Sequence, residues 1–503
     1  MNEIPPAIVW FRQDLRLADN PALRTAVDRG GPVIPLFVLE DADAGHRAPG
    51  GAGRWWLHGA LAALAEALKT HGAQLVLRRG PADRVLTDVV RESGAGAVFW
   101  NRCYEPWRIA RDTRIKRQLQ DDGIEVDSFN AALLFEPWTV ATGSGTPFKV
   151  YTPFWKAVRD REVPRPEQAP EHVPGRANVT TERLEDWGLR PTRPDWAGGL
   201  RDSWRPGEVA ARERLSDFLD HGLADYGRLR DRPDRAATSR LSPHLHWGEI
   251  GPRQVWHATR HRIDQDDLGQ AGWTFLGEVG WREFCHHLLY HWPSLPEENW
   301  RTAFDDFPWS NSEAHLKAWQ AGRTGYPIVD AGMRELWHTG WMHNRVRMIV
   351  GSFLVKDLRL HWTAGEAWFW DTLVDADLAN NAAGWQWIAG SGADAAPFFR
   401  IFNPVTQSEK FDPNGDYLRT WIPEIAALPD PYVHKPWEAP ERVLQEAGVV
   451  LGGITPAPWW TTPRPAGMPW RRSRRSRRIN DAHSHCRRRN NRPLDSLAAV
   501  ADP

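Results

Sequence analysis

The stretch AIVWF (7–11) is a short apolar run, and PVIPLFVL (32–39) is a second one. Both runs indicate β-strands. Further strands are expected at 74–78, 97–100 and 124–129, and helices at 54–69, 81–93 (with Pro81 at its first position) and 108–120. Strand–helix alternation of this length predicts a parallel, doubly wound sheet, so we expect an α/β domain over residues 1–135. Ligands of such sheets bind at the carboxyl ends of the strands.

The remaining sequence has a different pattern. Residues 136–205 are rich in Pro, Arg, Glu and Asp, which predicts a long surface connector. From 206 to 453 the pattern is helical, as in EVAARERLSDFLD (208–220), and an all-α domain is expected there. A chain of 503 residues also exceeds one ordinary core, which favours two domains.

Tryptophan is unusually frequent, with 30 residues against 7 Tyr and 5 Met. Bulk alone could explain this as core packing. Indole rings also stack on flat ligands and are easily oxidised, so the excess raises the expectation of a stacking ligand or of electron transfer. No apolar run of about 18 residues or export signal is visible, and three distant cysteines fit a reduced cytoplasm.

The net charge of −1 is unevenly distributed. Residues 454–503 hold 11 Arg against 3 Asp, and the preceding 453 residues carry the compensating negative charge. Binding to nucleic acid would therefore need a local basic face rather than a basic chain.

Two segments of the helical half combine polar and charged residues. Tyr226 and ATSRLSPHLHWGEI (237–250) place hydroxyls and an arginine before a helix, which suits a diphosphate, although an ordinary Ser/Thr cap would look the same. In FLGEVGWREFCHHLLYHWP (275–293), Glu278 and Arg282 have the i,i+4 spacing of a helix-surface pair. His287 and His291 share that spacing, but no further ligand is evident, so packing is favoured over a metal.

Two later segments contain even more polar, charged and aromatic residues. The first is GYPIVDAGMRELWHTGWMHNRVRMIVGSFLVKDL (325–358). A helix there can present Arg347 inward and Arg345 to a cleft. Alternatively, it is an amphipathic helix with two solvated arginines. DTLVDADLANNAAGWQWIAGSGADAAPFFRIFNP (371–404) combines paired acids, amides and tryptophans with small residues that leave room for a bulky ligand.

The motifs GYPIVDAGMREL, TGWMHNRVRM, DADLANN, GWQW and DAAPFFRIFNP occur in this order. Together with WFRQDLRLADNPAL (10–23) they resemble the photolyase/cryptochrome family, and in particular microbial class I/III cyclobutane pyrimidine dimer photolyases. The resemblance runs to about Gly453. It implies a deoxyribodipyrimidine photo-lyase in which reduced FAD, excited by light, passes an electron to a dimer and recovers it once the cyclobutane ring has split.

The resemblance also implies a set of cofactor contacts. The residues that would hold FAD are Tyr226, Thr238, Ser239, Arg240, Leu241, Ser242, Glu278, Arg282, Asn344, Arg347, Asp375, Asp377 and Asn381. Among them Asn381 would face flavin N5, and Arg347 would lie near Asp375. A neutral amide tolerates a reduced anionic flavin, whereas the Asp of plant cryptochromes adds a like charge. Asn381 therefore favours repair over signalling.

Residues for the substrate follow in the same way. Trp281 and Trp387 would sandwich a flipped-out dimer. Asn344 and Met348 would form the floor beneath it, and Glu278 would hydrogen-bond the pyrimidine edge. Extrusion is easier for a damaged base. Arg230, Arg345 and Arg400 are candidates for flanking phosphates, which give affinity without sequence preference, on single- or double-stranded DNA. Trp385, Trp362 and Trp309 match the family's electron-transfer chain. A monomer is expected.

Two alternatives stay open at this point. A cryptochrome photoreceptor would share the fold and FAD, and a (6-4) photolyase would differ around Asn344–Met348. Glu105, in NRCYEPW (101–107), is a candidate for the antenna pigment, which we expect to be methenyltetrahydrofolate, with 8-hydroxy-deazaflavin as the alternative.

The C-terminus departs from the family after Gly453. Trp has a single codon, and the codons from Pro458 onward, read one base earlier, can encode the Val-Val-Asp-His-Ala typical of the family. Residues 459–503 are therefore expected to be a frameshift product, or else a basic DNA-binding tail. Either way the Pro, Arg and Ser content of 454–503 predicts disorder.

Overall fold

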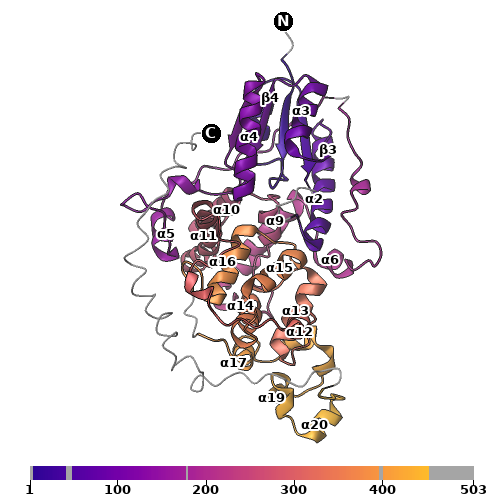
Figure 1. Cartoon of the computed structure of the whole chain (residues 1–503), viewed down its shortest axis with the longest axis vertical. Coiled ribbons are helices and arrows are strands. Elements are labelled where there is room, and N and C mark those ends of the chain that lie inside the picture. The colour runs from indigo at the N-terminus through magenta and orange to yellow at the C-terminus, as the bar shows by residue number, and fades with distance from the viewer. Residues whose placement is uncertain (1–3, 41–47, 177–178, 396–399, 453–503) are drawn as a thin grey trace. The chain divides into compact units, whose positions relative to one another are not determined.

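A computed structural model describes residues 4–40, 48–176, 179–395 and 400–452 (Figure 1). The chain divides into two compact units. The first unit comprises Met1–Pro296, Leu336–Trp341 and Trp368–Asn381, and the second comprises Glu297–Glu335, Met342–Ala367 and Ala382–Pro503. Each is described by itself below. The tail at 453–503, with its frameshift hypothesis, lies outside the described residues.

The N-terminal part of the first unit is a five-stranded sheet in the order β3-β2-β1-β4-β5, parallel at every pair. The strands are β1 (Ala7–Phe11), β2 (Val33–Leu39), β3 (Val76–Arg79), β4 (Ala97–Asn101) and β5 (Glu125–Phe129). The helices between them are α1 (Pro21–Asp28), α2 (Gly51–Thr70), α3 (Ala82–Ser93) and α4 (Pro106–Asp121). The predicted doubly wound α/β fold is confirmed.

Alternate residues of β1 enter two different cores, which is why helices cover both faces. Val9 and Phe11 pack in one cluster with Trp56 of α2. Ile8 and Trp10 pack in the other, together with residues of α3 and α4. One detail of the prediction is wrong: Pro81 is the N-cap of α3 rather than its first residue, because its ψ of 127° is extended.

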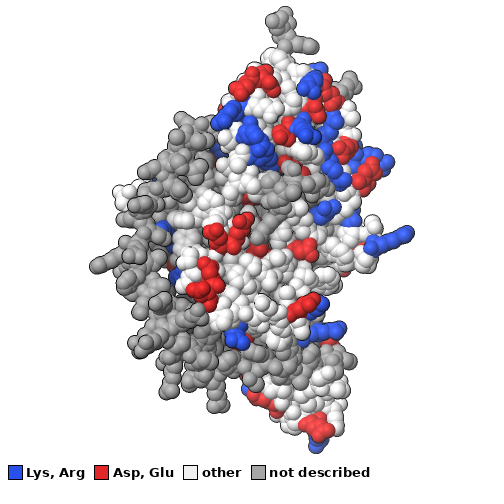
Figure 2. Space-filling model, viewed as in Figure 1, with Lys and Arg blue, Asp and Glu red and all other residues white. Residues whose placement is uncertain are grey.

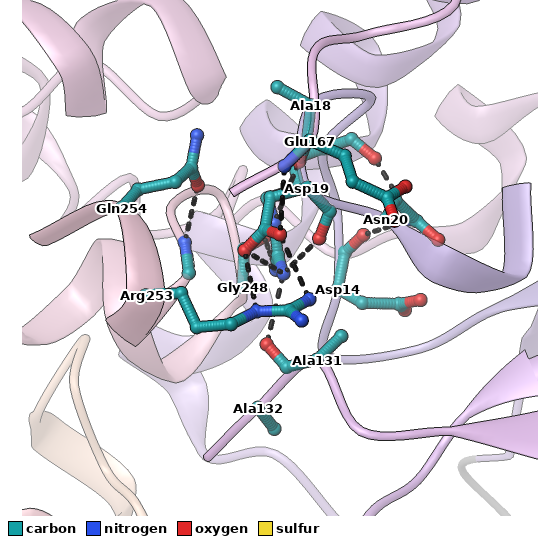
Figure 3. A network of polar contacts seen from close by, with 12 residues as sticks. Asp14, Ala18, Asp19, Asn20, Ala131, Ala132, Glu167, Gly248, Arg253 and Gln254 are labelled. Atoms are coloured by element: carbon teal, nitrogen blue, oxygen red, sulfur yellow. Dashed lines mark hydrogen bonds and ion pairs between the residues drawn. The ribbon is translucent and has the colours of Figure 1, made fainter. Parts of the chain in front are cut away.

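A buried polar network ties the sheet to the helical part of the first unit (Figure 3). Arg16 is 1% exposed and donates to the carbonyls of Gly248 and Ala131, both at 2.9 Å. Asp19 pairs with Arg253 at 2.9 Å. A buried guanidinium needs such partners, so the loop after β1 holds the segment at 248–253 in place.

Beyond residue 130, the described chain is helical and forms no further strand. Its helices are α5 (Tyr151–Val158), α6 (Gly198–Ser203), α7 (Glu208–Asp217), α8 (Tyr226–Leu229), α9 (Ser242–His246), α10 (Pro252–Asp266), α11 (Gly269–His291), α12 (Glu313–Gln320), α13 (Pro327–Thr339), α14 (Asn344–Ser352), α15 (Trp362–Thr372), α16 (Leu378–Ala389), α17 (Pro404–Phe411), α18 (Asp416–Trp421), α19 (Asp430–Val433) and α20 (Glu441–Glu446). Short 3-10 and π-helical turns join them. None of the described helices has the length and apolarity that a membrane crossing requires.

Residues 136–205 contain α5 and α6, and α5 packs against α11.

Charge is mixed on the face drawn in Figure 2, where basic and acidic side chains alternate over the α/β elements. The described part of that face therefore shows interspersed charge over α3 and α4 rather than one basic patch.

Candidate functional site

The loop at 237–242 leads into α9 and carries the predicted diphosphate residues. Arg240 adopts a left-handed backbone with φ of 51°, which is uncommon for a residue with a side chain. Its guanidinium lies 4.8 Å from the ring of Trp204 and 4.6 Å from the ring of Trp341. Trp341 Nε1 also donates to Ser242 Oγ at 3.4 Å. The loop is therefore held by two aromatic rings and offers several hydroxyls beside one fixed cation.

The structure does not show the ordinary Ser/Thr helix cap, because the N-cap of α9 is Leu241, which makes no side-chain cap hydrogen bond. Ser239 Oγ accepts from the backbone N–H of Leu241 at 3.4 Å, and Leu241 is 1% exposed as the N-cap of α9. Thr238 is half-buried, and Ser242 is exposed at the first position of α9. The hydroxyls of Thr238 and Ser242 thus remain the stronger candidates for a ligand.

Glu278, on α11, pairs with Arg230 rather than with Arg282. Arg230 Nη1 lies 2.7 Å from Glu278 Oε1. Arg282 instead donates to the Ala132 carbonyl at 2.7 Å. The predicted i,i+4 pair is wrong because each side chain finds a tertiary partner on another segment. Arg230 also lies over the ring of Tyr226 at 5.4 Å, so three predicted residues meet here.

Trp281 stacks on Tyr151 of α5, with ring centroids 3.7 Å apart and planes inclined by 12°. Tyr151 donates its hydroxyl to the Gly277 carbonyl at 2.5 Å, which fixes the ring. Sequence reasoning missed Tyr151, since it lies in the stretch predicted to be a connector. The aromatic run YTPFW (151–155) was the available sign. One face of the Trp281 indole is therefore supported by a second ring.

The start of α16 is organised around Asp377. Its Oδ1 accepts from the backbone N–H of Asn380 at 2.8 Å and from Asn380 Nδ2 at 2.6 Å. Asn381 N donates to the Asp377 carbonyl at 2.8 Å, and the Asn381 residue is 9% exposed. Asp375, two residues earlier, is also buried. Asp377 thus caps the helix that carries the candidate N5 partner.

Two histidines that sequence reasoning did not single out flank this carboxylate. His286 Nε2 lies 3.5 Å and His246 Nδ1 lies 3.8 Å from Asp377 Oδ2. Burial alone would raise the pKa of Asp377, but the two imidazoles hold that pKa well below its usual range. A lone histidine gives no signal until its partner is located, which explains the omission.

The histidines that sequence reasoning did consider are structural. His287 Nε2 accepts from the Phe148 N–H at 3.0 Å, and burial together with His291 lowers the pKa of His287 to about 3. No cluster of His, Cys, Asp and Glu suited to a metal occurs among the described residues.

In the second unit, α14 begins with Asn344, which is exposed, followed by Arg345, Arg347 and Met348, which are half-buried. Arg347 Nε donates to the Met342 carbonyl at 2.8 Å. The Arg345 guanidinium lies 4.4 Å from the Phe411 ring. Neither arginine is simply a solvated surface charge.

The second unit also brings the predicted electron-transfer tryptophans near one another. Trp362 is 0% and Trp385 is 2% exposed, while Trp309 is half-buried. Gly365 lets the Trp385 ring approach α15 one turn after Trp362, since a Cβ there would overlap that ring. His361, missed by sequence reasoning, lies with its ring centroid 4.9 Å from that of Trp309 and 5.6 Å from that of Trp362.

Two further predicted residues lie on either side of the gap at 396–399. Trp387 is half-buried on α16. Arg400 is exposed, and its carbonyl accepts from Lys356 Nζ at 2.9 Å. The part of the DAAPFFRIFNP motif at 396–399 lies outside the described residues.

Glu105 lines a recess in the first unit with about 500 Å³ of empty space, its open mouth included. Gln13, Trp107, Arg108 and Trp370 also line it. Gln13 follows β1 and Glu105 follows β4, which are adjacent strands where the strand order reverses. The recess therefore occupies the position at which doubly wound sheets bind ligands.

Comparison with known proteins agrees with this arrangement. Residues 7–171 match the DNA photolyase family model, and residues 275–462 match the FAD binding domain of DNA photolyase. The chain is 53% identical to the deoxyribodipyrimidine photo-lyase of Agrobacterium fabrum, covering 90% of this chain and 94% of that protein. It is 42% identical to cryptochrome-1 of Arabidopsis thaliana, covering 90% and 68%.

A solved structure gives the same result. The bacterial class III photolyase from Agrobacterium tumefaciens superposes with a TM-score of 0.89 at 49% identity, covering 96% of this chain and 98% of that chain. The fold, the two family models and these relatives together show that the chain belongs to the photolyase/cryptochrome family.

Proposed function

We propose that this protein is an enzyme that uses light to repair cyclobutane pyrimidine dimers in DNA. The observation that carries the proposal is the first turn of α16, where the neutral Asn381 follows the capping carboxylate Asp377. A neutral amide beside a flavin ring accommodates a reduced anionic flavin, whereas a carboxylate would oppose it. This feature favours repair over a photoreceptor function.

The donor set of the first unit fits FAD. The hydroxyls of Thr238, Ser239 and Ser242 and the fixed guanidinium of Arg240 suit a diphosphate, with Leu241 and Tyr226 packed behind them. In the first unit we assign the flavin ring to Asp377 and Asn381, with Glu278, Arg282 and Asp375. Asn344 and Arg347 of the second unit are assigned to the cofactor from the family motif alone. Bound there in its reduced form, FAD would supply one-electron chemistry under near-ultraviolet or blue light, with no net redox change.

The chain's own residues bind and orient the dimer. Trp281, supported by Tyr151, and Trp387 stack on the extruded pyrimidines, while Glu278, Asn344 and Met348 contact their edges. Arg230, Arg345 and Arg400 bind flanking phosphates, and this makes binding independent of sequence on single- and double-stranded DNA. Arg230 is already paired with Glu278. The residue that binds a phosphate is therefore linked directly to the residue that contacts the dimer edge.

Trp309, Trp362 and Trp385 form the route by which external electrons reduce the flavin. Two observations support this route. The His361 ring lies close to the rings of both Trp309 and Trp362, and the Trp385 ring approaches α15 closely at Gly365. The indole N–H of Trp362 donates to Asn299 Oδ1 at 2.8 Å, so its proton is held by a neutral acceptor.

The recess at Glu105 is our proposed antenna site. Its carboxylate can accept from a ring N–H, and Trp107 and Trp370 supply flat surfaces for stacking. Methenyltetrahydrofolate is the first candidate and 8-hydroxy-deazaflavin the second, and the absorption spectrum of the purified protein distinguishes them.

The protein is proposed to act as a cytoplasmic monomer on ultraviolet-damaged DNA. Its organisation is an antenna domain at 1–135, a connector at 136–205 and a flavin domain at 206–453, with the tail at 454–503 outside that assignment.

A substrate panel tests the proposal. Reduced protein is illuminated with oligonucleotides that contain either a cyclobutane dimer or a (6-4) photoproduct, and remaining lesions are counted by chromatography. Loss of the cyclobutane dimer alone supports the proposal. Loss of the (6-4) product alone would favour the other class of photolyase, and binding of FAD without repair of either would favour a photoreceptor.

A further inference from the structure

The carboxylate of Asp377 lies between two imidazoles from different helices. His286 comes from α11 and His246 from the end of α9. The side chains are 15% exposed for Asp377, 10% for His286 and 8% for His246. Water therefore contributes little to the charge balance around this carboxylate.

One hydrogen bond and one ion-pair contact point to the protonation of His286. Its Nδ1 lies 3.0 Å from the Arg282 carbonyl oxygen, which only accepts, so Nδ1 carries a proton. Its Nε2 faces Asp377 Oδ2 at 3.5 Å. The other oxygen of Asp377 already accepts two N–H bonds from Asn380, and such bonds favour the ionised carboxylate. An ionised carboxylate also only accepts, so Nε2 carries a proton as well.

The surrounding charges are mixed. Arg282, on the same helix, opposes a positive charge on His286. The buried Glu283, whose pKa burial raises to about 7, favours that charge once it is ionised. The Glu283 carboxylate accepts from the N–H groups of Leu134 at 2.8 Å and Phe135 at 3.2 Å. Burial lowers the pKa of His286, but the attraction of Asp377 outweighs it and leaves the pKa above its ordinary value.

We propose that His286 is a positioning residue: it is held as an imidazolium, and its charge fixes the Asp377 carboxylate that caps α16. Asn381 donates its N–H to the carbonyl of Asp377, so a displaced Asp377 would also move the first turn and the amide proposed to face the flavin. The link to the flavin rests on the proposed function, whereas the protonation state and the capping do not.

The first test measures protonation directly. The full chain with its flavin is labelled with 15N-histidine, and the His286 signals are identified by their loss in His286→Gln. The proposal predicts that both ring nitrogens of His286 carry protons at pH 7.5, which places both nitrogens in the imidazolium range. A single protonated nitrogen at that pH overturns it.

The second test is the pH profile of thermal stability. A histidine with a raised pKa in the folded state stabilises fully below its unfolded pKa of about 6.5, and the contribution is lost as pH rises through the folded pKa. The gap in melting temperature between the parent protein and His286→Gln should therefore narrow from pH 6.5 to 9. A gap that stays constant contradicts the proposal.

Two variants complete the design. His286→Arg retains the charge, so its melting temperature should exceed that of His286→Gln by a margin that does not shrink as pH rises. His287→Gln removes a neighbouring buried histidine that is neutral in the folded protein throughout this range, so its gap should not narrow between pH 6.5 and 9. Neither readout needs dimer repair, so a failure of the proposed function remains distinguishable.

Discussion

The buried carboxylate of Asp357, in the second unit, should make the free energy of unfolding depend on pH. The residue is 0% exposed, and within the described structure neither carboxylate oxygen has a hydrogen-bond partner. Burial raises its pKa to about 8, and the nearby Lys356 offsets only part of that rise. An unfolded Asp titrates near pH 3.9, so the unfolded chain releases this proton about 4 pH units earlier. Asp357 therefore destabilises the fold progressively as pH rises from about 4 to 8.

The magnitude follows from about 1.4 kcal/mol per pH unit. The penalty is about 1.5 kcal/mol at pH 5 and about 5 kcal/mol at pH 8, a change of roughly 4 kcal/mol. The near-isosteric Asp357→Asn cannot ionise. Relative to the parent protein, its free energy of unfolding should thus improve by that amount between pH 5 and pH 8. Burial lowers the pKa of Lys356 to about 8, so the loss of its proton makes the fold more stable as pH rises, but only above pH 8.

Urea denaturation of both proteins at pH 5, 6.5 and 8 measures this difference. Asp306→Asn, which removes an exposed carboxylate from the same unit, is the matched control. Parallel pH profiles for the parent and Asp357→Asn would refute the reasoning, because they would mean that the buried group is already ionised in the folded protein.

Three further predictions concern function. Trp281→Ala removes the ring that stacks on Tyr151. In anisotropy titrations it should weaken binding of dimer-containing oligonucleotides by about 1–3 kcal/mol and leave binding of undamaged DNA unchanged. Equal losses of affinity for both kinds of DNA would argue against a stacking role. Arg230→Gln should lower affinity for all DNA and reduce the salt dependence by roughly one ion, and an unchanged salt slope would remove Arg230 from the phosphate contacts. Trp362→Phe should slow photoreduction of oxidised flavin, followed by absorbance, while chemically reduced protein still repairs dimers; normal photoreduction would exclude this route.

Strands β1, β2 and β4 were predictable because each is a short, mostly apolar run. The helical half was predictable in class, whereas the assignment of the loop at 237–242 to a diphosphate, made from its hydroxyls, stays a prediction. Tertiary partners were not predictable. Glu278 turned to Arg230 rather than to its helical neighbour Arg282, and Tyr151 met Trp281 across about 130 positions of sequence.

The buried charges near Asp377 illustrate the same limit. Sequence spacing drew attention to His287 and His291, which face backbone groups, whereas His286 lies beside the carboxylate. Helical spacing shows which residues share a face, but the partner of that face is set by packing between distant segments. Protonation states follow only once those partners are known.

The most direct test of the central claim is a single-turnover repair experiment. Anaerobic, fully reduced protein is mixed with an equal amount of an oligonucleotide carrying one cyclobutane thymine dimer, and one half is illuminated with blue light while the other stays dark. Light-driven repair should restore intact thymines in the illuminated half only, with the flavin still reduced at the end. Dimers that persist in the light, or that disappear equally in the dark, would contradict it.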